Sequence, residues 1–327
     1  MKLIIQIPCL NEEKNLRQTV ADLPKVLDRI DEIEVLVIDD GSEDGTSEVA
    51  RSLEVDHLVR LPRNRGLARA FMAGLDASLA SGADLIVNTD ADNQYRGEDI
   101  ATLIRPILEG EAEIVIGDRR PQTLEHFSFT KRQLQKFGSW VVRLFSDTDV
   151  PDTTSGFRAY SRDAALRIHV ISDYTYTLES IIQAGKKQIA ISSEPVSTNE
   201  PLRRSTLIKS VPDYIKKSVV AILRSYAMYE PLRVFVLLGS FFLLGGGILG
   251  IRFLYYYFSS QGAAGHVQSV ILAGVLLVIG FMIWVLGILA DLISANRALV
   301  EETLYRVKRM ELAASSRSDI RRSNEEK

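Results

Sequence analysis

The first 120 residues of the chain alternate short apolar runs with segments of helical periodicity. Five apolar runs are expected to form strands, at residues 3–8, 35–39, 57–61, 84–89 and 113–119. Helical patterns lie between them, at residues 14–30, 46–53, 66–80 and 98–109. Short apolar strands joined by helices indicate a doubly wound, mostly parallel sheet that is covered on both faces. The predicted fold class is therefore α/β.

Polar clusters follow each of the first four predicted strands and read CLNEE, DDGSEDGT, PRNRG and DADNQ. One such cluster alone is equally well interpreted as a solvated loop, because Asp and Asn are common turn residues. Four of them at the carboxyl ends of parallel strands lie at one sheet edge, where open α/β sheets bind their ligands. The sequence therefore favours a binding site at this edge.

The fourth cluster places Asp90 and Asp92 one residue apart, directly after an apolar run. Their like charges repel at this spacing, and a divalent cation between them would offset the repulsion. Carboxylate oxygens, together with the side-chain carbonyl of Gln94, suit Mg²⁺ or Mn²⁺, hard cations that also bind the phosphates of a substrate. We expect this turn to hold such a cation against a diphosphate group.

Several other chemistries are disfavoured by what the sequence lacks. No G-x-G-x-x-G follows the first predicted strand and no G-x-x-x-x-G-K-[ST] occurs, which argues against a dinucleotide-binding domain and a P-loop NTPase. The lone Cys9 leaves no cysteine-based zinc site and no internal disulfide. The net charge of −3 gives no support to a nucleic-acid partner.

Two long apolar segments dominate the last third of the chain. The first is uncharged over 234–251 and continues past Arg252 to Phe258, and the second covers 267–290. Each is long enough to cross roughly 30 Å of hydrocarbon as a helix. Basic residues flank the pair on its outer sides and are missing from the connecting loop, so the positive-inside rule places both termini in the cytoplasm. We expect an integral, multi-pass protein of the cytoplasmic membrane, in contact with membrane lipids, with its N-terminal domain on the cytoplasmic side.

Four parts are expected along the chain: an α/β domain (1–206), juxtamembrane amphipathic helices (207–233), two transmembrane helices (234–258 and 267–290, together 234–290), and a cytoplasmic helix with a polar tail (291–327). The tail, from Ser315 on, is expected to be disordered. Gly246 and Gly250 are candidates for close helix contact. Ile293, Val300, Leu304 and Val307 recur near heptad spacing, but over too short a stretch to fix an oligomeric state. A homo-oligomer stays an open alternative.

Seven motifs taken together resemble those of one enzyme family. IPCLNEEKNL, VIDDGSEDGT, NRGLARAFMAGL, DADNQ, VIGDRR, DTTSGFRAY and LRRSTL occur in the order and spacing of family 2 glycosyltransferases with a GT-A fold. Over residues 1–230 the chain is most similar to the polyprenyl-phosphate glycosyltransferases, and its apolar hairpin resembles that of the undecaprenyl-phosphate glucosyltransferases. The resemblance implies a metal-dependent hexosyltransferase that moves a sugar from a UDP- or GDP-sugar to undecaprenyl or dolichyl phosphate.

The resemblance also implies roles for matching positions. The donor nucleoside would be held by Pro8, Asn11, Glu12, Asp39 and Asp40, and the rest of the donor would contact Asp90, Ala91, Ser155 and Arg203 or Arg204. The metal ligands would be Asp90, Asp92 and Gln94, with Asp92 also near the sugar. The lipid phosphate would be bound by Arg119 and Arg132. Gly156 would line the pocket beside Ser155, and Glu179 matches a glutamate of a following helix. The chain departs from the family's usual D-A-D-L-Q pattern at Asn93 and carries Tyr95 and Arg96 in place of the residues that usually follow.

The chemistry of the acceptor predicts a simple mechanism. A lipid monophosphate is already ionised near neutral pH, since its second pKa is about 6, and it needs no general base. It needs arginines to hold it near an anionic donor and a metal to stabilise the departing nucleoside diphosphate. We therefore expect direct in-line attack on the anomeric carbon with inversion, and no catalytic role for the four histidines, His57, His126, His169 and His266.

Three rival functions fit the sequence less well. A processive polysaccharide synthase carries a Q-x-x-R-W motif, which precedes neither Trp140 nor Trp284. A sugar nucleotidyltransferase begins with a glycine-rich loop bearing Lys or Arg, unlike PCLNEE. A non-catalytic membrane scaffold would not need carboxylates at successive strand ends.

Overall fold

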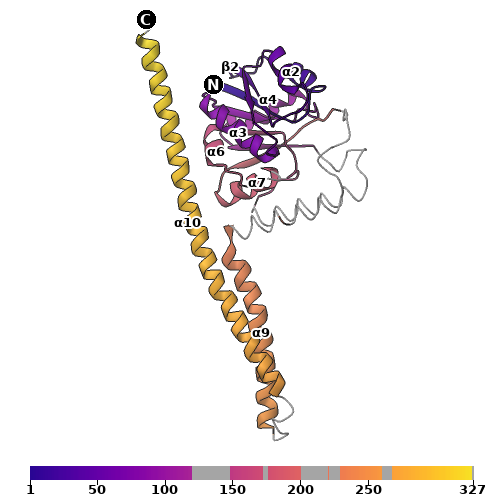
Figure 1. Cartoon of the computed structure of the whole chain (residues 1–327), viewed down its shortest axis with the longest axis vertical. Coiled ribbons are helices and arrows are strands. Elements are labelled where there is room, and N and C mark those ends of the chain that lie inside the picture. The colour runs from indigo at the N-terminus through magenta and orange to yellow at the C-terminus, as the bar shows by residue number, and fades with distance from the viewer. Residues whose placement is uncertain (120–147, 172–175, 200–219, 221–228, 260–266, 326–327) are drawn as a thin grey trace. The chain divides into compact units, whose positions relative to one another are not determined.

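The computed structural model describes residues 1–119, 148–171, 176–199, 220, 229–259 and 267–325. The chain divides into two compact units. The first comprises Met1–Ile222 together with Leu304–Lys327, and the second comprises Leu223–Thr303. Figure 1 traces the elements of both units along the chain. The four-part organisation expected from the sequence stays a prediction, because these units are defined by internal packing alone.

The described part of the first unit contains a seven-stranded sheet with the order β3-β2-β1-β4-β6-β5-β7. Its strands are β1 (Lys2–Cys9), β2 (Glu32–Asp39), β3 (His57–Arg60), β4 (Leu85–Asn88), β5 (Ile114–Asp118), β6 (Arg158–Ser161) and β7 (Ile191–Pro195). Strand β6 runs antiparallel to both β4 and β5, whereas all other neighbouring pairs are parallel. The predicted mostly parallel α/β sheet is therefore confirmed.

Helices pack on both faces of this sheet, as a doubly wound fold requires. They are α1 (Leu16–Ala21), α2 (Thr46–Ser52), α3 (Leu67–Ala80), the short 3₁₀ helix η1 (Gly97–Asp99), α4 (Ile100–Leu108), α6 (Arg162–Arg167) and α7 (Tyr176–Lys186). Alternate residues of β1 divide between two cores. Leu3, Ile5 and Ile7 share a buried cluster with α4, while α3 packs on β1 and β2 and contributes the buried Phe71.

The first helix is shorter than the sequence pattern predicts. Residues 14–30 were expected to be helical, but α1 ends at Ala21. Pro24 follows shortly after this end, and a proline disfavours helical geometry in the residue before it. The early end of α1 leaves a short non-helical connection into β2, which begins at Glu32.

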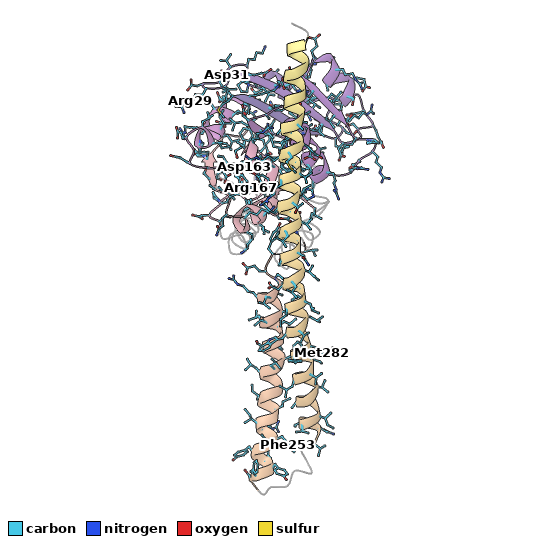
Figure 2. The ribbon with its side chains drawn as sticks, turned by 90° about the vertical axis from the view of Figure 1, so that its left-hand side faces the viewer. Arg29, Asp31, Asp163, Arg167, Phe253 and Met282 are labelled. Atoms are coloured by element: carbon cyan, nitrogen blue, oxygen red, sulfur yellow. The ribbon has the colours of Figure 1, made fainter. Side chains whose placement is uncertain are left out.

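The second unit contains two long helices, α9 (Pro231–Phe258) and the first part of α10 (Val267–Glu325), which run side by side (Figures 1 and 2). Both are long and apolar enough to cross a membrane by length and composition. Glycines allow the close approach. A Cβ on Gly239 would lie 2.9 Å from the carbonyl oxygen of Gly280, and one on Gly246 would lie 2.9 Å from that of Ala273. Trp284 donates its indole N–H to the carbonyl of Val236 at 3.2 Å.

Two expectations about these helices need correction. Gly246 lies at the helix contact as predicted, but a Cβ on Gly250 would meet nothing within 4 Å, so Gly250 takes no part in it. The contacting small residues of α9 are Gly239 and Gly246, which lie two helical turns apart instead of one. The polar tail from Ser315 on, expected to be disordered, is helical as far as Glu325, because α10 continues without a break.

Candidate active site

The loops after β1 and β2 are joined by side chains that were predicted to bind a nucleoside. Asn11 accepts a hydrogen bond from the Glu43 amide at 2.9 Å, and its own amide donates to Ser42 at 2.9 Å. Glu12 is buried, and its amide donates to Thr46 Oγ1 at 2.9 Å. Asn11 has a φ of 57°, a conformation that asparagine tolerates better than most residues. These contacts fix the two loops against one another beside the buried Pro8.

The adjacent acids at the end of β2 serve different loops. Asp39 is fully buried and accepts hydrogen bonds from the amide of Ser42 at 2.7 Å and from the hydroxyl of Ser47. Burial alone would raise its pKa, but these bonds and nearby Arg60 hold the pKa below its ordinary value. Asp40 instead accepts two bonds of 2.8 Å from the amides of Arg65 and Gly66, at the start of α3. Both carboxylates thus order the edge of the sheet by accepting bonds from the amides of the loops beside them.

The acid turn after β4 is compact and bends where the sequence departs from the family pattern. Asn93 has a φ of 55°, and the amide of Gln94 donates to Asp92 Oδ1 at 3.2 Å. The carbonyl of Ala91 accepts a bond of 2.8 Å from the hydroxyl of Thr19, which ties the turn to α1. Asparagine adopts the left-handed conformation at lower cost than leucine does. The asparagine that stands here in place of the family's usual leucine therefore suits this backbone. The turn presents Asp90, Asp92 and Gln94 from one short loop.

The Asp90 carboxyl has the most strongly raised pKa among the described acids. Its side chain retains some exposed surface, yet protein atoms crowd its carboxylate closely. Burial, and next the charge of Asp92, raise its pKa to about 7, while Arg119 and Arg158 act in the opposite direction. A carboxylate held in this way gains most from a cation. The arrangement is compatible with a cation bound beside Asp90 and Asp92.

The donor set also fits a divalent metal in kind. Among the described residues no group of three or more His, Cys, Asp and Glu side chains could hold an ion by itself. Two carboxylates and an amide oxygen remain a suitable partial set for Mg²⁺ or Mn²⁺, because these ions commonly complete their coordination with substrate phosphates and water. The side-chain oxygen of Asn93 is buried and has no hydrogen-bond partner in the described part of the chain. The turn is therefore an oxygen-rich site that lacks enough ligands to close around a metal alone.

Arg119 follows β5 and lies beside this acid turn. It forms a two-pronged pair with Asp152, at 2.7 Å through Nε and 3.0 Å through Nη2, and Nη2 also donates to Thr154 Oγ1 at 2.9 Å. Burial would lower the pKa of Arg119, but the nearby Tyr95, Asp152 and Asp90 outweigh burial and raise the pKa above its ordinary value. Burial would raise the pKa of Asp152, and Arg119 keeps it below the ordinary value. The structure thus supplies a fixed cation beside Asp90, the kind of group that anionic phosphates need.

Arg158, at the start of β6, is a buried residue that was not predicted from the sequence. Its guanidinium donates to the carbonyls of Thr153, Ser155 and Thr177 at 3.0, 2.7 and 2.9 Å, and to Ser180 Oγ at 2.8 Å. These neutral partners lie on the loop before β6 and on α7. Arg158 therefore shapes the loop that carries Asp152, Ser155 and Gly156. The only sequence signal for it was its place in the motif DTTSGFRAY.

The remaining predicted site residues fall into two groups. Ser155 is fully buried, and Glu179 is buried with its carboxylate accepting the amide of Ile171 at 3.0 Å, which is a structural contact. Three candidate arginines lie outside the described residues: Arg132, Arg203 and Arg204. The structure thus brings together the acid turn, Arg119 and the loop at Ser155 and Gly156, and places Asp39, Asp40 and Glu12 on neighbouring loops of the same sheet edge.

Comparisons with known proteins agree with this arrangement. A family model described as "Glycosyl transferase family 2" matches residues 4–168. Among curated relatives, a UDP-N-acetylglucosamine--dolichyl-phosphate N-acetylglucosaminyltransferase of Methanococcus voltae is 30% identical over 216 residues, covering 59% of this chain and 83% of the relative. A polyprenol monophosphomannose synthase of Mycolicibacterium smegmatis is 26% identical, covering 61% and 78%. An undecaprenyl-phosphate mannosyltransferase of Micrococcus luteus is 30% identical, covering 50% and 68%.

Among solved structures, the fold is similar to that of glucosyl-3-phosphoglycerate synthase from Mycobacterium tuberculosis. One such structure, a complex with Mn²⁺, UDP and glucosyl-3-phosphoglycerate, has a TM-score of 0.54 and 20% sequence identity, covering 69% of this chain and 79% of that chain. A second, with Mn²⁺, UDP-glucose and phosphoglyceric acid, has a TM-score of 0.55 at 18% identity, covering 69% and 80%. At this identity the likeness shows the fold, and it confirms the predicted GT-A architecture of the sheet.

Proposed function

The chain belongs to glycosyl transferase family 2, and from that premise we propose that it is a membrane-bound, inverting transferase acting on a polyprenyl phosphate. It moves a hexose from a UDP- or GDP-sugar to undecaprenyl or dolichyl phosphate and yields a polyprenyl-phosphate sugar. The observation that carries the proposal is the acid turn of Asp90 and Asp92 beside the buried cation Arg119, in a chain that also has two helices of membrane length. The acid turn and Arg119 suit an anionic donor and an anionic acceptor, and the two long apolar helices suit a lipid environment.

The choice of acceptor is supported by three relatives and by the helices. All three relatives reported above act, by their names, on dolichyl, polyprenol or undecaprenyl phosphate carriers. A lipid carrier is confined to the membrane, so a transferase that uses it benefits from an anchor in the same bilayer. We assign α9 and the apolar part of α10 to that anchor, with the glycosyltransferase domain and both termini on the cytoplasmic side.

Asp90, Asp92 and Gln94 would hold Mg²⁺ or Mn²⁺ together with the donor diphosphate. When bound, the metal supplies positive charge that stabilises the leaving nucleoside diphosphate. The chain's own contribution is the shape of the turn, since Asn93 bends it and the carbonyl of Ala91 ties it to Thr19. Asp92 would also contact the sugar of the bound donor.

The arginines hold the acceptor. Arg119 is fixed by Asp152 and Thr154, so its charge is oriented before any substrate arrives and little side-chain entropy is lost on binding. Arg132 joins it on the lipid phosphate, and Arg203 or Arg204 clamps the donor diphosphate. The acceptor phosphate is already ionised and attacks the anomeric carbon in line, with the nucleoside diphosphate leaving from the opposite face.

The loops after β1 and β2 complete the donor site. Pro8, Asn11 and Glu12 lie at the end of the first strand and on the loop that follows it, and Asp39 and Asp40 lie at the end of the second strand. Their carboxylate and amide oxygens accept hydrogen bonds from the base and ribose of the donor. Ser155, on the loop before β6, would contact the rest of the donor.

The test uses the purified full chain in lipid nanodiscs with polyprenyl phosphate, Mg²⁺ or Mn²⁺, and a panel of labelled UDP- and GDP-sugars. Label should enter the lipid phase with one donor. Asp90→Ala and Asp92→Ala should each reduce the rate at least about 100-fold, the loss seen when a group that stabilises developing charge is removed. The control is Asp28→Ala, because the Asp28 side chain is 98% exposed. Transfer by both site variants at near the normal rate, or no label in lipid from any donor, would contradict the proposal.

A further inference from the structure

The carboxylate of Asp90 rests on the backbone of Gly156. A Cβ added to Gly156 would lie 2.8 Å from Asp90 Oδ1 and 3.0 Å from Oδ2, and also 3.0 Å from the hydroxyl of Tyr176. Such separations are shorter than van der Waals contact, so only glycine leaves room for the carboxylate at this place. The position of Asp90 therefore depends on where the Gly156 peptide lies.

Side chains from separate elements hold Gly156 from both sides. Its N–H donates to the hydroxyl of Tyr95 at 3.2 Å. Its carbonyl accepts one bond from Asn88 Nδ2 at 2.8 Å and another from the hydroxyl of Tyr176 at 3.2 Å. The polar groups of this glycine are thus bonded to the acid turn, to the end of β4 and to α7.

The three holding side chains are themselves fixed. The Tyr176 ring stacks on Phe71 with centroids 4.0 Å apart, and the Tyr95 ring stacks on Phe157 at 4.8 Å. Asn88 is fully buried, and its Oδ1 accepts a bond of 2.9 Å from Gln6 while Nδ2 also donates to the Tyr176 hydroxyl at 2.9 Å. Stacked rings and a fully bonded amide have little freedom to move, so the support is rigid.

Both tyrosines act here as neutral hydrogen-bonding groups. Burial raises the pKa of Tyr95 to about 12 and that of Tyr176 well above its ordinary value. Both hydroxyls are therefore available as neutral hydrogen-bond donors and acceptors. Their contribution is geometric.

We propose that Tyr95, Tyr176 and Asn88 are positioning residues that lock the Gly156 peptide and thereby aim Asp90 at the metal. Tyr95 stands at one of the positions where the sequence departs from the family pattern, and the proposal gives that residue a task. The inference rests on the proposed function only in that Asp90 is taken as a metal ligand. Groups that orient a metal ligand without touching the metal commonly change metal affinity when they are removed.

The test measures the affinity for Mn²⁺ alone, by electron paramagnetic resonance of free Mn²⁺ over the full chain in detergent. Tyr95→Phe and Tyr176→Phe each remove one oxygen and keep the stacked ring. We expect each to weaken Mn²⁺ binding about 3- to 10-fold, the range for one hydrogen bond, and the double variant to weaken it more than either single change. The control is Tyr160→Phe, since Tyr160 is equally buried and its hydroxyl lies near Arg158 and Ser180 and makes no hydrogen bond to Gly156 in the described part of the chain.

The outcomes separate this inference from the proposed function. If the unaltered protein binds Mn²⁺ and the Tyr95 and Tyr176 variants bind it equally well, the inference is wrong and the metal site stands. A lower melting temperature in these variants with unchanged Mn²⁺ affinity would also overturn the inference, because it shows a purely structural role. If the unaltered protein binds no Mn²⁺ and Asp90→Ala behaves identically, the inference falls together with the proposed metal site.

Discussion

At the amino ends of the strands Lys2 and His57 both lie against Glu34, whereas at the carboxyl end of β4 Asp90 faces Asp92. The first group is balanced: Lys2 Nζ is 2.6 Å from Glu34 Oε1, and His57 Nε2 is 2.7 Å from Glu34 Oε2. Asp31, labelled in Figure 2, similarly pairs with the amino terminus. The pKa of Glu34 is lowered by these partners, while that of Asp90 is raised to about 7. At the amino end Glu34 is paired with basic groups, whereas at the carboxyl end Asp90 lies beside another acid, Asp92.

The difference favours the carboxyl edge as the one suited to binding a cation. A paired carboxylate gains little from a further cation, because its charge is already offset. A carboxylate raised in pKa by burial and by a like charge gains much more, and such groups concentrate at functional sites. Arg119 lies beside the acid turn but does not relieve the charge of Asp90 fully. Two of its nitrogens, Nε and Nη2, are bonded to Asp152 instead. Substitutions at the two edges test whether this contrast holds.

The largest effect on stability is expected from Asp152→Asn. The Arg119 and Asp152 side chains are 11% and 0% exposed, so the variant leaves a buried cation without its counter-charge. Breaking a buried pair in this way costs about 3–5 kcal/mol, which should lower the melting temperature by roughly 10 °C. Thermal unfolding in detergent measures the shift. Thr154→Val is the comparison, since it keeps both charges and removes only the hydroxyl, which accepts a bond of 2.9 Å from Arg119 and donates one of 3.0 Å to Asp152, and it should cost about 2 kcal/mol. A melting temperature for Asp152→Asn equal to that of the unaltered protein would refute this prediction.

Gly156→Ala is expected to act on both stability and metal binding. The added methyl meets Asp90 and Tyr176 at 2.8–3.0 Å, so the carboxylate must move. We expect Mn²⁺ affinity to fall at least about 10-fold and stability to fall by about 1–3 kcal/mol. Gly45→Ala is the matched control, because a Cβ there meets only the side chain of Glu13, at 3.0 Å or more. Equal Mn²⁺ affinity in the two alanine variants would show that Gly156 does not support Asp90.

Asp40→Asn should have a smaller effect at the same edge. Asp40 accepts two bonds of 2.8 Å from the amides of Arg65 and Gly66, and an asparagine can accept only one of them. The expected loss is about 1–2 kcal/mol, the usual cost of removing a side chain that caps a helix start. Thermal unfolding checks it, with Glu43→Gln in the exposed part of the neighbouring loop as the control. The prediction fails if both variants melt together.

The sequence predicted the first five strands of the sheet better than the last two. The apolar runs of β1 to β5 are visible in the sequence, most clearly in β1, β4 and β5, which are buried along nearly their whole length, and the rule that ligands bind at the carboxyl ends then predicts where the site lies. Strands β6 and β7 read RAYS and ISSEP and show no such run, because they are short and polar. Arg158 is fully buried within β6, and no hydrophobicity pattern predicts a charged residue in a core.

Residues that support the site were harder to predict than residues that line it. Asp90 and Asp92 carry a visible chemical signal, a close pair of acids after an apolar run. Tyr95 and Tyr176 carry none, because an aromatic residue most often fills a core and its hydroxyl partner is fixed only by the fold. The conformation of Asn93 was predictable in retrospect, since asparagine is a frequent residue at positive φ.

The smallest effect is expected at the opposite edge, from Glu34→Gln, and pH gives it a signature. The folded pKa of Glu34 is below its ordinary value of 4.5, so its contribution is present above that pH and is lost as pH falls through the folded pKa. The folded pKa of Lys2 is above its ordinary value of 10.5, so its contribution is present below that pH and is lost as pH rises further. Between these limits the variant should melt about 1–3 °C below the unaltered protein.

Melting curves recorded from about pH 3 to about pH 8 measure the gap, which should close in acid because protonated glutamate and glutamine are then alike. Mn²⁺ affinity measured on the same variant should equal that of the unaltered protein, because Glu34 lies at the end of the sheet remote from the acid turn. A gap that persists unchanged in acid would show that Glu34 stabilises the fold through packing. A loss of Mn²⁺ affinity would contradict the proposed difference between the two edges. It would show that Glu34, a charge at the opposite end of the sheet, also affects metal binding by Asp90 and Asp92.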